Sequence, residues 1–193
     1  MKNCLLLVIV ASAAACAPAS GPEDAAPAVT PSYNPSTGRL EQLTADRNGD
    51  GKVDTWAFMD GVRLERVEID RDADGRPDRW EHYEESPGDT ASGGVRLTQA
   101  EERPVPDGIV TRREFYTAGV LERVEEDTTA SGRANKWEFY TSGVLARVEL
   151  DLAGRGTPDQ RLVYGPSGDV ERIERDADGD GQFEPVTQDL ARR

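Results

Sequence analysis

Three short segments of the sequence place acidic residues at alternate positions around a glycine, a pattern that could bind a metal ion. Their oxygen-bearing residues are Asp46, Asn48, Asp50 and Asp54 in the first segment, Asp70, Asp72, Asp74 and Asp78 in the second, and Asp176, Asp178, Asp180 and Glu184 in the third. Carboxylates at alternate positions of a tightly bent loop can direct several oxygens at one centre, as a hard cation such as Ca²⁺ requires. We predict that these residues are the metal ligands of calcium sites.

Ordinary turn chemistry is the alternative for any one of these loops, because Asp, Asn and Gly are also the residues that turns prefer. Several copies in one chain favour metal binding, since the carboxylates of one loop repel each other unless a cation lies among them. Mg²⁺ fits less well than Ca²⁺, because it demands near-octahedral geometry and keeps several waters. We therefore expect Ca²⁺ as the cofactor.

The acidic loops belong to a repeat of about 24 residues, and each copy carries one loop glycine. These glycines are Gly51, Gly75, Gly108, Gly132, Gly156 and Gly181. Between consecutive glycines, a short aromatic run such as 137–140 is followed by a turn and by a second run such as 145–149. Short runs rich in aromatic and β-branched residues, separated by glycine turns, are typical of β-hairpins. The sequence predicts an all-β domain at 45–185, built as a meandering antiparallel sheet or a solenoid of hairpins.

Two strands in each repeat have a geometric consequence. All acidic loops must lie on one edge of the sheet and all hairpin turns on the other, with successive loops ~10 Å apart. The interval from Gly75 to Gly108 is longer than the others, and its additional residues fall in the turn at 86–94. We interpret that turn as an insertion tolerated at a loop tip, with a partner-binding loop as the alternative.

Further loops at 103–111, 127–135 and 151–159 keep the glycine but lose ligands. Arg155 stands where a carboxylate would be needed. We predict that these loops are metal-free turns of the same shape, although Asp127 and Asn135 leave a weak site open.

The acidic loops resemble the calcium loop of EF-hands, and more closely the β-embedded loops of FG-GAP and thrombospondin type 3 repeats. In the second loop Glu81 stands at the twelfth position, where EF-hands carry a bidentate glutamate. However, residues 79–83 alternate as a strand does, and Pro77 lies inside the loop. The resemblance therefore implies calcium binding without a helix–loop–helix. The rhythm of the hairpins and the placement of their aromatic residues resemble the MORN and YD-type repeat families.

The first residues have the form of an export signal. Lys2, an apolar run at 5–10 and small residues before Cys16 are typical of a secretory signal peptide at 1–15, and the run is too short to cross a membrane. A cysteine directly after Ala14 and Ala15 resembles the lipobox of bacterial lipoproteins, with Ala13 in place of the usual Leu. This resemblance implies cleavage before Cys16, lipidation of Cys16 and anchoring to a membrane. Ordinary cleavage that leaves a free thiol is the alternative.

Because Ala17 rather than Asp follows Cys16, the resemblance implies the outer membrane of the cell envelope, with either a periplasmic or a surface-exposed orientation. Residues 16–44 are rich in Pro, Ala, Ser and Thr, which predicts a disordered tether. Residues 186–193 are expected to be a C-terminal tail.

Charge and composition exclude several functions. A formal net charge of −14 argues against a nucleic-acid partner, which would require basic patches. The sequence contains one histidine, His82, and no recognisable nucleophile motif, phosphate loop or zinc spacing. We therefore expect a non-enzymatic protein with a structural or adhesion-like role and a protein or glycan partner. The alternative is a periplasm-facing assembly or accessory lipoprotein whose acidic loops are metal-free turns.

Overall fold

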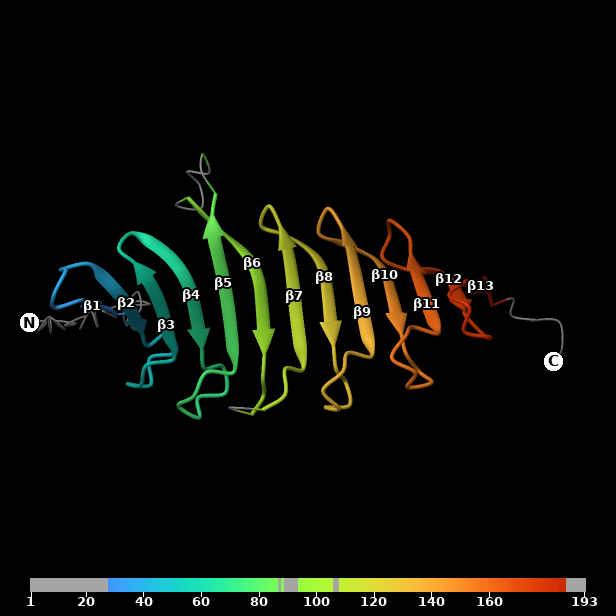
Figure 1. Ribbon diagram of the computed structural model, residues 1–193, viewed down its shortest axis with the longest axis horizontal. Helices are drawn as coiled ribbons and strands as arrows, with labels where there is room; N and C mark the ends of the chain where they lie inside the picture. The colour runs from blue at the N-terminus through green and yellow to red at the C-terminus, as the bar shows by residue number, and fades with distance from the viewer. Residues whose placement is uncertain (1–27, 87, 89–93, 106–107, 187–193) are drawn as a thin grey trace, which may run out of the picture.

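The computed structural model describes residues 28–86, 88, 94–105 and 108–186, which form one sheet of 13 antiparallel strands hydrogen-bonded in chain order (Figure 1). The strands are β1 (Val29–Tyr33), β2 (Leu40–Ala45), β3 (Thr55–Asp60), β4 (Arg63–Ile69), β5 (Arg79–Glu85), β6 (Val95–Glu102), β7 (Arg112–Thr117), β8 (Val120–Glu126), β9 (Lys136–Thr141), β10 (Val144–Leu150), β11 (Gln160–Tyr164), β12 (Val170–Arg175) and β13 (Glu184–Pro185). The described residues contain no helix. The predicted all-β meander of hairpins is confirmed, and the sheet is open.

The sheet begins earlier than the sequence predicted. Residues 28–44, assigned to the disordered tether, contain β1 and most of β2, and Val29 pairs with Ala45 while Pro31 pairs with Leu43. Pro31 is compatible with a strand here because β1 lies at the edge of the sheet, where the absent N–H need not enter a ladder. The tether prediction is therefore wrong for these residues. The signal peptide, Cys16 and the rest of the predicted tether lie outside the described residues, as do residues 187–193 of the predicted tail.

The two edges of the sheet differ as predicted. Figure 1 shows the hairpin turns along the upper edge and the loops of the acidic segments along the lower edge. In the turn between β7 and β8, Ala118 and Gly119 have φ values of 52° and 77°, the left-handed pair that a tight hairpin requires. The long turn between β5 and β6 is also on the upper edge, closed by a hydrogen bond from Ser86 N to Gly94 O of 2.8 Å. The acidic loops are therefore separated from every hairpin turn by the full length of the strands.

The sheet is a single layer with two different faces. Cross-strand partners such as Phe58 and Arg66 share one face, here called the Arg face, where the guanidinium of Arg66 lies 4.1 Å from the centroid of the Phe58 ring. Arg123 lies over Phe115 at 4.3 Å and Arg147 over Phe139 at 4.0 Å on the same face. Stacking of arginine on phenylalanine is therefore repeated along the array.

The opposite face, here called the Tyr face, carries Tyr83, Tyr116, Tyr140 and Tyr164. The buried apolar side chains of the described residues, Ala100, Val124 and Val148, also lie on this face. Tyrosine hydroxyls donate to glutamates within the same strand, Tyr116 to Glu114 at 2.7 Å and Tyr140 to Glu138 at 2.7 Å. The thin core of the protein is therefore on the Tyr face.

Candidate metal sites in the acidic loops

The acidic loops share one backbone conformation with two left-handed residues. The fourth residue of the loop is left-handed at Gly49, Ala73, Ala130, Gly154 and Gly179, and the sixth is left-handed at Gly51, Gly75, Gly132, Gly156 and Gly181. Alanine is strained in this region because its Cβ approaches the backbone, and the φ values of Ala73 and Ala130 are 61° and 54°. These five loops, with and without the predicted ligands, therefore share the same left-handed positions, so backbone shape does not separate them. The loop at 103–111 was predicted to have the same shape, but its Gly108 is not left-handed.

In most of these loops the first aspartate is used to hold the loop together. Asp46 Oδ1 accepts hydrogen bonds from the N–H groups of Gly49 and Asp50 at 2.7 and 3.2 Å, and its Oδ2 accepts one from Gly51 at 2.8 Å. Asp151 binds the N–H groups of Arg155 and Gly156 in the same way, at 2.9 and 2.7 Å. A carboxylate at this position therefore has a structural role that needs no ion.

The second loop departs from this pattern at Asp70. Oδ2 of Asp70 accepts the N–H of Gly75 at 2.7 Å, but its Oδ1 is buried and has no hydrogen-bond partner among the described residues. The N–H of Asp74 is directed to Asp72 Oδ1 instead, at 3.2 Å. Asp70 is only 6% exposed. A buried charged oxygen without a partner costs at least ~1–3 kcal/mol, which a bound cation would offset.

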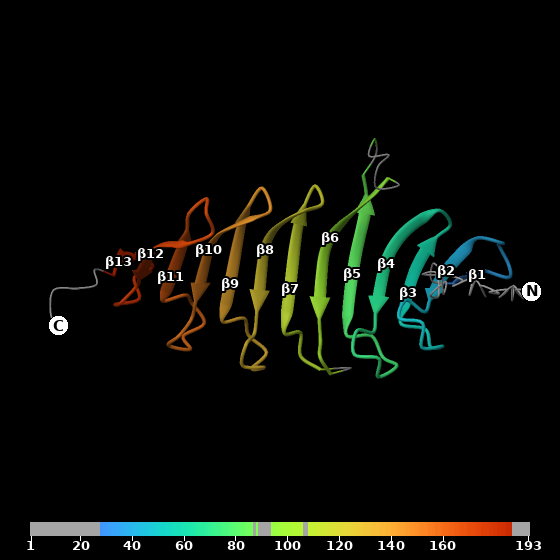
Figure 2. The same cartoon turned by 180° about the vertical axis from the view of Figure 1, so that it is seen from behind.

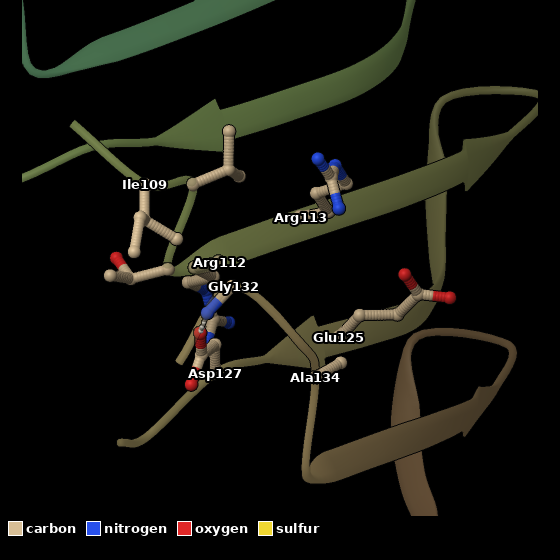
Figure 3. Close-up of a pocket in the computed structure, with 9 residues that line it drawn as sticks. Ile109, Arg112, Arg113, Glu125, Asp127, Gly132 and Ala134 are labelled. Carbon is tan, nitrogen blue, oxygen red and sulfur yellow. Dashed lines mark hydrogen bonds between the residues drawn. The ribbon is translucent and has the colours of Figure 1, made fainter. Parts of the chain in front are cut away.

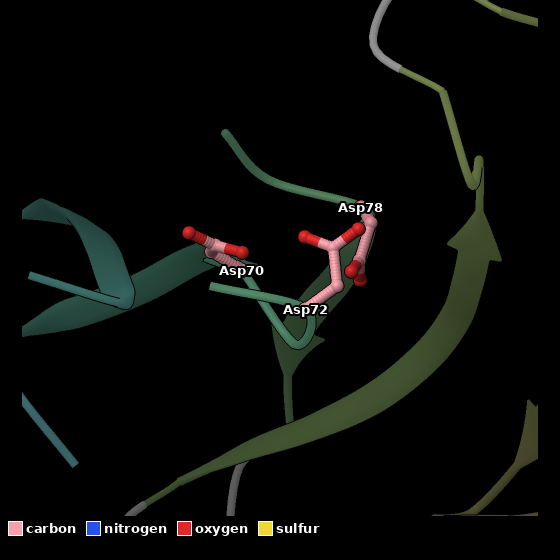
Figure 4. A group of neighbouring side chains, drawn as sticks. All are labelled: Asp70, Asp72 and Asp78. Carbon is pink, nitrogen blue, oxygen red and sulfur yellow. The ribbon is translucent and has the colours of Figure 1, made fainter. Parts of the chain in front are cut away.

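Other carboxylates converge on this loop (Figure 4). Asp70, Asp72 and Asp78 each offer one oxygen, and these oxygens all lie within 4.8 Å of one another. Burial raises the pKa of Asp78, and the negative charge of Asp72 raises it further, although hydrogen bonding to Arg71 opposes the shift. Asp74 is not part of the group. These three carboxylates are oxygen donors of the kind that a hard divalent cation such as Ca²⁺ binds, and Asp70 also carries the buried oxygen that has no partner among the described residues.

The third predicted site, in the last loop, is only partly assembled. Asp176, Asp178 and Asp180 offer oxygens within 4.8 Å of one another. Both oxygens of Asp176 already accept N–H groups, from Gly179 at 2.7 Å and Gly181 at 3.0 Å. Glu184 instead lies in β13, opposite Arg175.

A positive charge from the neighbouring loop also lies beside this third site. Arg155 Nη2 is 3.4 Å from the carbonyl oxygen of Asp176, at the start of the last loop. The last loop therefore has a carboxylate cluster but, unlike the second, no buried oxygen without a partner among the described residues.

The first loop differs from the second in its carboxylates. Asp46, Asp50 and Asp54 do not form a group of close carboxylate oxygens in the described chain. Asp54 Oδ2 accepts the N–H groups of Arg47 and Asn48 at 2.9 and 3.1 Å, and its Oδ1 accepts the Thr55 hydroxyl at 2.8 Å. Both carboxylate oxygens of Asp54 therefore already accept hydrogen bonds from nearby protein donors.

The loop at 127–135 shows how the same backbone is satisfied without an ion. Asp127 accepts the N–H groups of Thr129, Ser131 and Gly132 at 3.1, 3.1 and 2.6 Å, together with the Thr129 hydroxyl at 3.1 Å. Burial opposes ionisation of Asp127, but these donors outweigh it and lower its pKa to about 2. Asn135 accepts the N–H of Thr128 at 2.9 Å. The sequence left Asp127 and Asn135 open as a weak metal site. In the structure their oxygens already accept hydrogen bonds from protein donors.

The cavities at this edge of the sheet lie between neighbouring loops. The one in Figure 3 has a volume of about 70 Å³ and is lined by Ile109, Arg112, Asp127 and their neighbours. It is too small for an organic ligand, since such sites usually measure ~300–1,000 Å³. A wider groove of about 620 Å³ separates the loops at 127–135 and 151–159. Neither is lined by residues of the two converging groups, Asp70, Asp72 and Asp78 or Asp176, Asp178 and Asp180.

Glu81, which the EF-hand resemblance places at a twelfth ligand position, does not belong to the second loop. It accepts hydrogen bonds from Arg79 Nε at 2.8 Å and the Tyr83 hydroxyl at 2.9 Å, on the Tyr face. The sequence could not reveal the special role of Asp70, because Asp46, Asp70 and Asp176 occupy the same motif position. Among the local differences, Ala73 stands where the first and last loops have glycine, and Pro77 stands where they have Val53 and Phe183.

No family model matches this sequence, and no curated protein matches it. A solved structure described as TcdB2-TccC3-TEV is similar over 83% of this chain, with 16% sequence identity and a TM-score of 0.24. The chain spans 11% of that protein's chain. The described residues include no helix long and apolar enough to cross a membrane.

Proposed function

We propose that this protein is a calcium-binding β-hairpin array of the cell envelope, with a structural or partner-binding role. The observation that carries the proposal is Asp70 Oδ1, a buried carboxylate oxygen without a hydrogen-bond partner among the described residues, in a loop where Asp72 and Asp78 converge. A divalent cation would bind all of these oxygens and remove their mutual repulsion. We therefore expect calcium to bind the loop at 70–78 before any other loop.

Calcium would act on the sheet through the connections between loops. Asp70 N donates to Asp54 O at 2.8 Å, and Arg103 N donates to Asp78 O at 2.8 Å, so the second loop is bonded to both neighbouring segments. An ion that fixes Asp70 and Asp78 relative to each other would also fix these contacts. Calcium then stiffens the loop edge of a sheet that has little apolar core.

Calorimetric titration of the chain with Ca²⁺ and Mg²⁺ tests the proposal. We expect Ca²⁺ to bind with a dissociation constant of ~10⁻⁴–10⁻³ M, as extracellular calcium modules do, and more tightly than Mg²⁺. Asp70→Asn should abolish the first binding event. Asp127→Asn is the matched control, because it changes the same position in a loop that its own donors satisfy, and it should leave binding unchanged. Absence of binding heat at millimolar Ca²⁺ would refute the proposal.

The envelope location rests on the sequence of residues 1–17. We propose that Cys16 is lipidated and anchors the array to the outer membrane, where it contacts a protein or glycan partner. Mass spectrometry of the N-terminal peptide should show acylated Cys16, and Cys16→Ser should release the protein from the membrane fraction. Protease treatment of intact cells then distinguishes a surface-exposed array, which is digested, from a periplasmic one, which survives.

A second candidate function is an assembly or accessory lipoprotein facing the periplasm, with metal-free loops. The observation that favours it is the first loop, where Asp46 and Asp54 are satisfied by donors of the loop and of Thr55. If melting curves in calcium and in chelator are identical, this candidate replaces the first.

A further inference from the structure

The Tyr face carries a continuous apolar stripe across ten strands, β3 to β12. Its members are Met59, Leu64, Tyr83, Leu97, Tyr116, Leu121, Tyr140, Leu145, Tyr164 and Val170, which pair across the five hairpins. Tyrosine lies in β5, β7, β9 and β11, and leucine lies in β4, β6, β8 and β10. The stripe therefore alternates between a large and a smaller side chain at each strand.

This stripe lies on the surface of a single-layer sheet. An apolar sheet face is normally covered by a second layer of structure. In the described part of the chain every strand belongs to the same sheet, and neither Figure 1 nor Figure 2, the view from behind, shows an element packed across a face. The covering layer must come from outside the described residues.

The charged groups beside the stripe are paired within the chain. Arg79 is 6% exposed and forms ion pairs of 2.8 Å with Glu81, Glu102 and Glu114. Lys136 pairs with Glu126 and Glu138 at 2.7 Å each. Covering this face would therefore bury no charge without a partner, which avoids the larger cost of an unpaired buried charge.

The size of the face matches a stable dimer interface. Ten strands spaced ~4.8 Å apart extend over ~43 Å, and six residues along each strand extend over ~20 Å, which gives roughly 800 Å². Specific interfaces bury about 800 Å² on each partner.

The stripe is also complementary to itself. Its centre lies between β7 and β8, so a two-fold axis parallel to the strands at that point would place β7 of one copy over β8 of the other. Tyr116 would then face Leu121 of a second copy, and each remaining tyrosine of the stripe would face a leucine, so that large and small side chains interdigitate.

We propose that the Tyr face is the interface of a symmetric, face-to-face dimer of this chain. Two sheets pack about 10 Å apart, with their strands aligned to within about 30°, and together form a two-layer sandwich. Tyr116 and Leu121 lie beside the two-fold axis, near the turn ends of their strands, and the Arg faces of both copies remain on the outside. The dimer does not depend on the calcium proposal, because none of its residues belongs to an acidic loop.

Sedimentation of the chain carrying Cys4→Ser and Cys16→Ser, which removes both cysteines and so excludes a disulfide-linked dimer, tests the proposal. At about 50 µM, well above the micromolar dissociation constants of moderate interfaces, we expect a dimer. Leu121→Glu should raise the dissociation constant at least about 100-fold, because the change occurs twice, once in each copy beside the two-fold axis. Val163→Glu is the matched control: Val163 pairs with Arg172 on the Arg face, so this variant should remain dimeric.

A second measurement does not depend on the folding of a variant. The melting midpoint of the unaltered dimer should rise with protein concentration, because association stabilises the folded state by mass action. A concentration-independent midpoint, or a monomer at about 50 µM, overturns the proposal. So does a Leu121→Glu variant that keeps the far-UV circular dichroism of a β-sheet and remains dimeric.

Discussion

The loops at 70–78 and 127–135 have the same backbone conformation but satisfy their first aspartate differently. In the loop at 127–135, Thr129 and Ser131 supply a hydroxyl and N–H groups to Asp127. In the loop at 70–78, Asp70 Oδ1 is buried without a partner among the described residues, and Asp72 and Asp78 bring further negative charge. Donors from the protein therefore do in one loop what a cation would do in the other.

The comparison shows that a shared loop shape need not have a shared function. The fourth residue is a left-handed alanine in both loops, Ala73 and Ala130, so the backbone is not the cause of the difference. The side chains at the alternate positions do differ between these two loops. Hydroxyls there can donate to the first aspartate, whereas carboxylates can only accept.

The largest expected effect is on the stability gained from calcium. With Ca²⁺ at about 100 times its dissociation constant, a single site adds ~2.7 kcal/mol to the free energy of unfolding. Asp70→Asn should remove this gain and Asp127→Asn should keep it, as measured by melting with and without chelator. An equal calcium response in both variants would show that the two loops do not differ in metal binding.

The next effect is the stability of the ion-free protein. In chelator, Asp127→Ala should lower the melting midpoint by several degrees, because the donors of Thr129, Ser131 and Gly132 lose their acceptor. Asp70→Asn in chelator should leave the midpoint unchanged or raise it, because it removes a charge that repels Asp72. A large loss of stability in Asp70→Asn would contradict the contrast between the loops.

A smaller effect is expected from backbone strain, which the two loops share. Ala73→Gly and Ala130→Gly should each stabilise the protein by about 1 kcal/mol, because glycine adopts the left-handed region without the Cβ clash. Chemical denaturation in chelator measures both variants. If only one of the two is stabilised, the backbones are not equivalent in energy.

The last expected effect is the pH dependence, and it has opposite signs in the two loops. The pKa of Asp127 is lowered to about 2, so its contribution to stability is present above the unfolded value of 3.8 and is lost as the pH falls from 3.8 through 2. The pKa of Asp78 is raised, so its contribution is present below 3.8 and is lost as the pH rises through the folded value. NMR titration of the carboxyl carbons in chelator should show Asp127 titrating below 3.8 and Asp78 above it.

Much of the architecture could be predicted from local patterns. The spacing of the loop glycines and the short aromatic runs predicted the hairpins, and two strands in each repeat required the acidic loops to share one edge. These features depend on contacts between residues close in the sequence. The hairpin of β1 and β2 was missed because its composition, with Pro31 and Pro35, is that of a tether, and only pairing of β2 with β3 makes it part of the sheet.

The sequence by itself determined where the acidic loops and turns lie, because a hairpin's period and its turn residues act locally. The tertiary structure decided which loop carries an unsatisfied oxygen. Asp46, Asp70 and Asp176 are equivalent in the motif, but the partner of a buried oxygen depends on which N–H groups the folded loop directs at it. Strand pairing also placed tyrosine and leucine in one stripe and arginine over phenylalanine on the other face, because a side chain's neighbours across a sheet come from other strands.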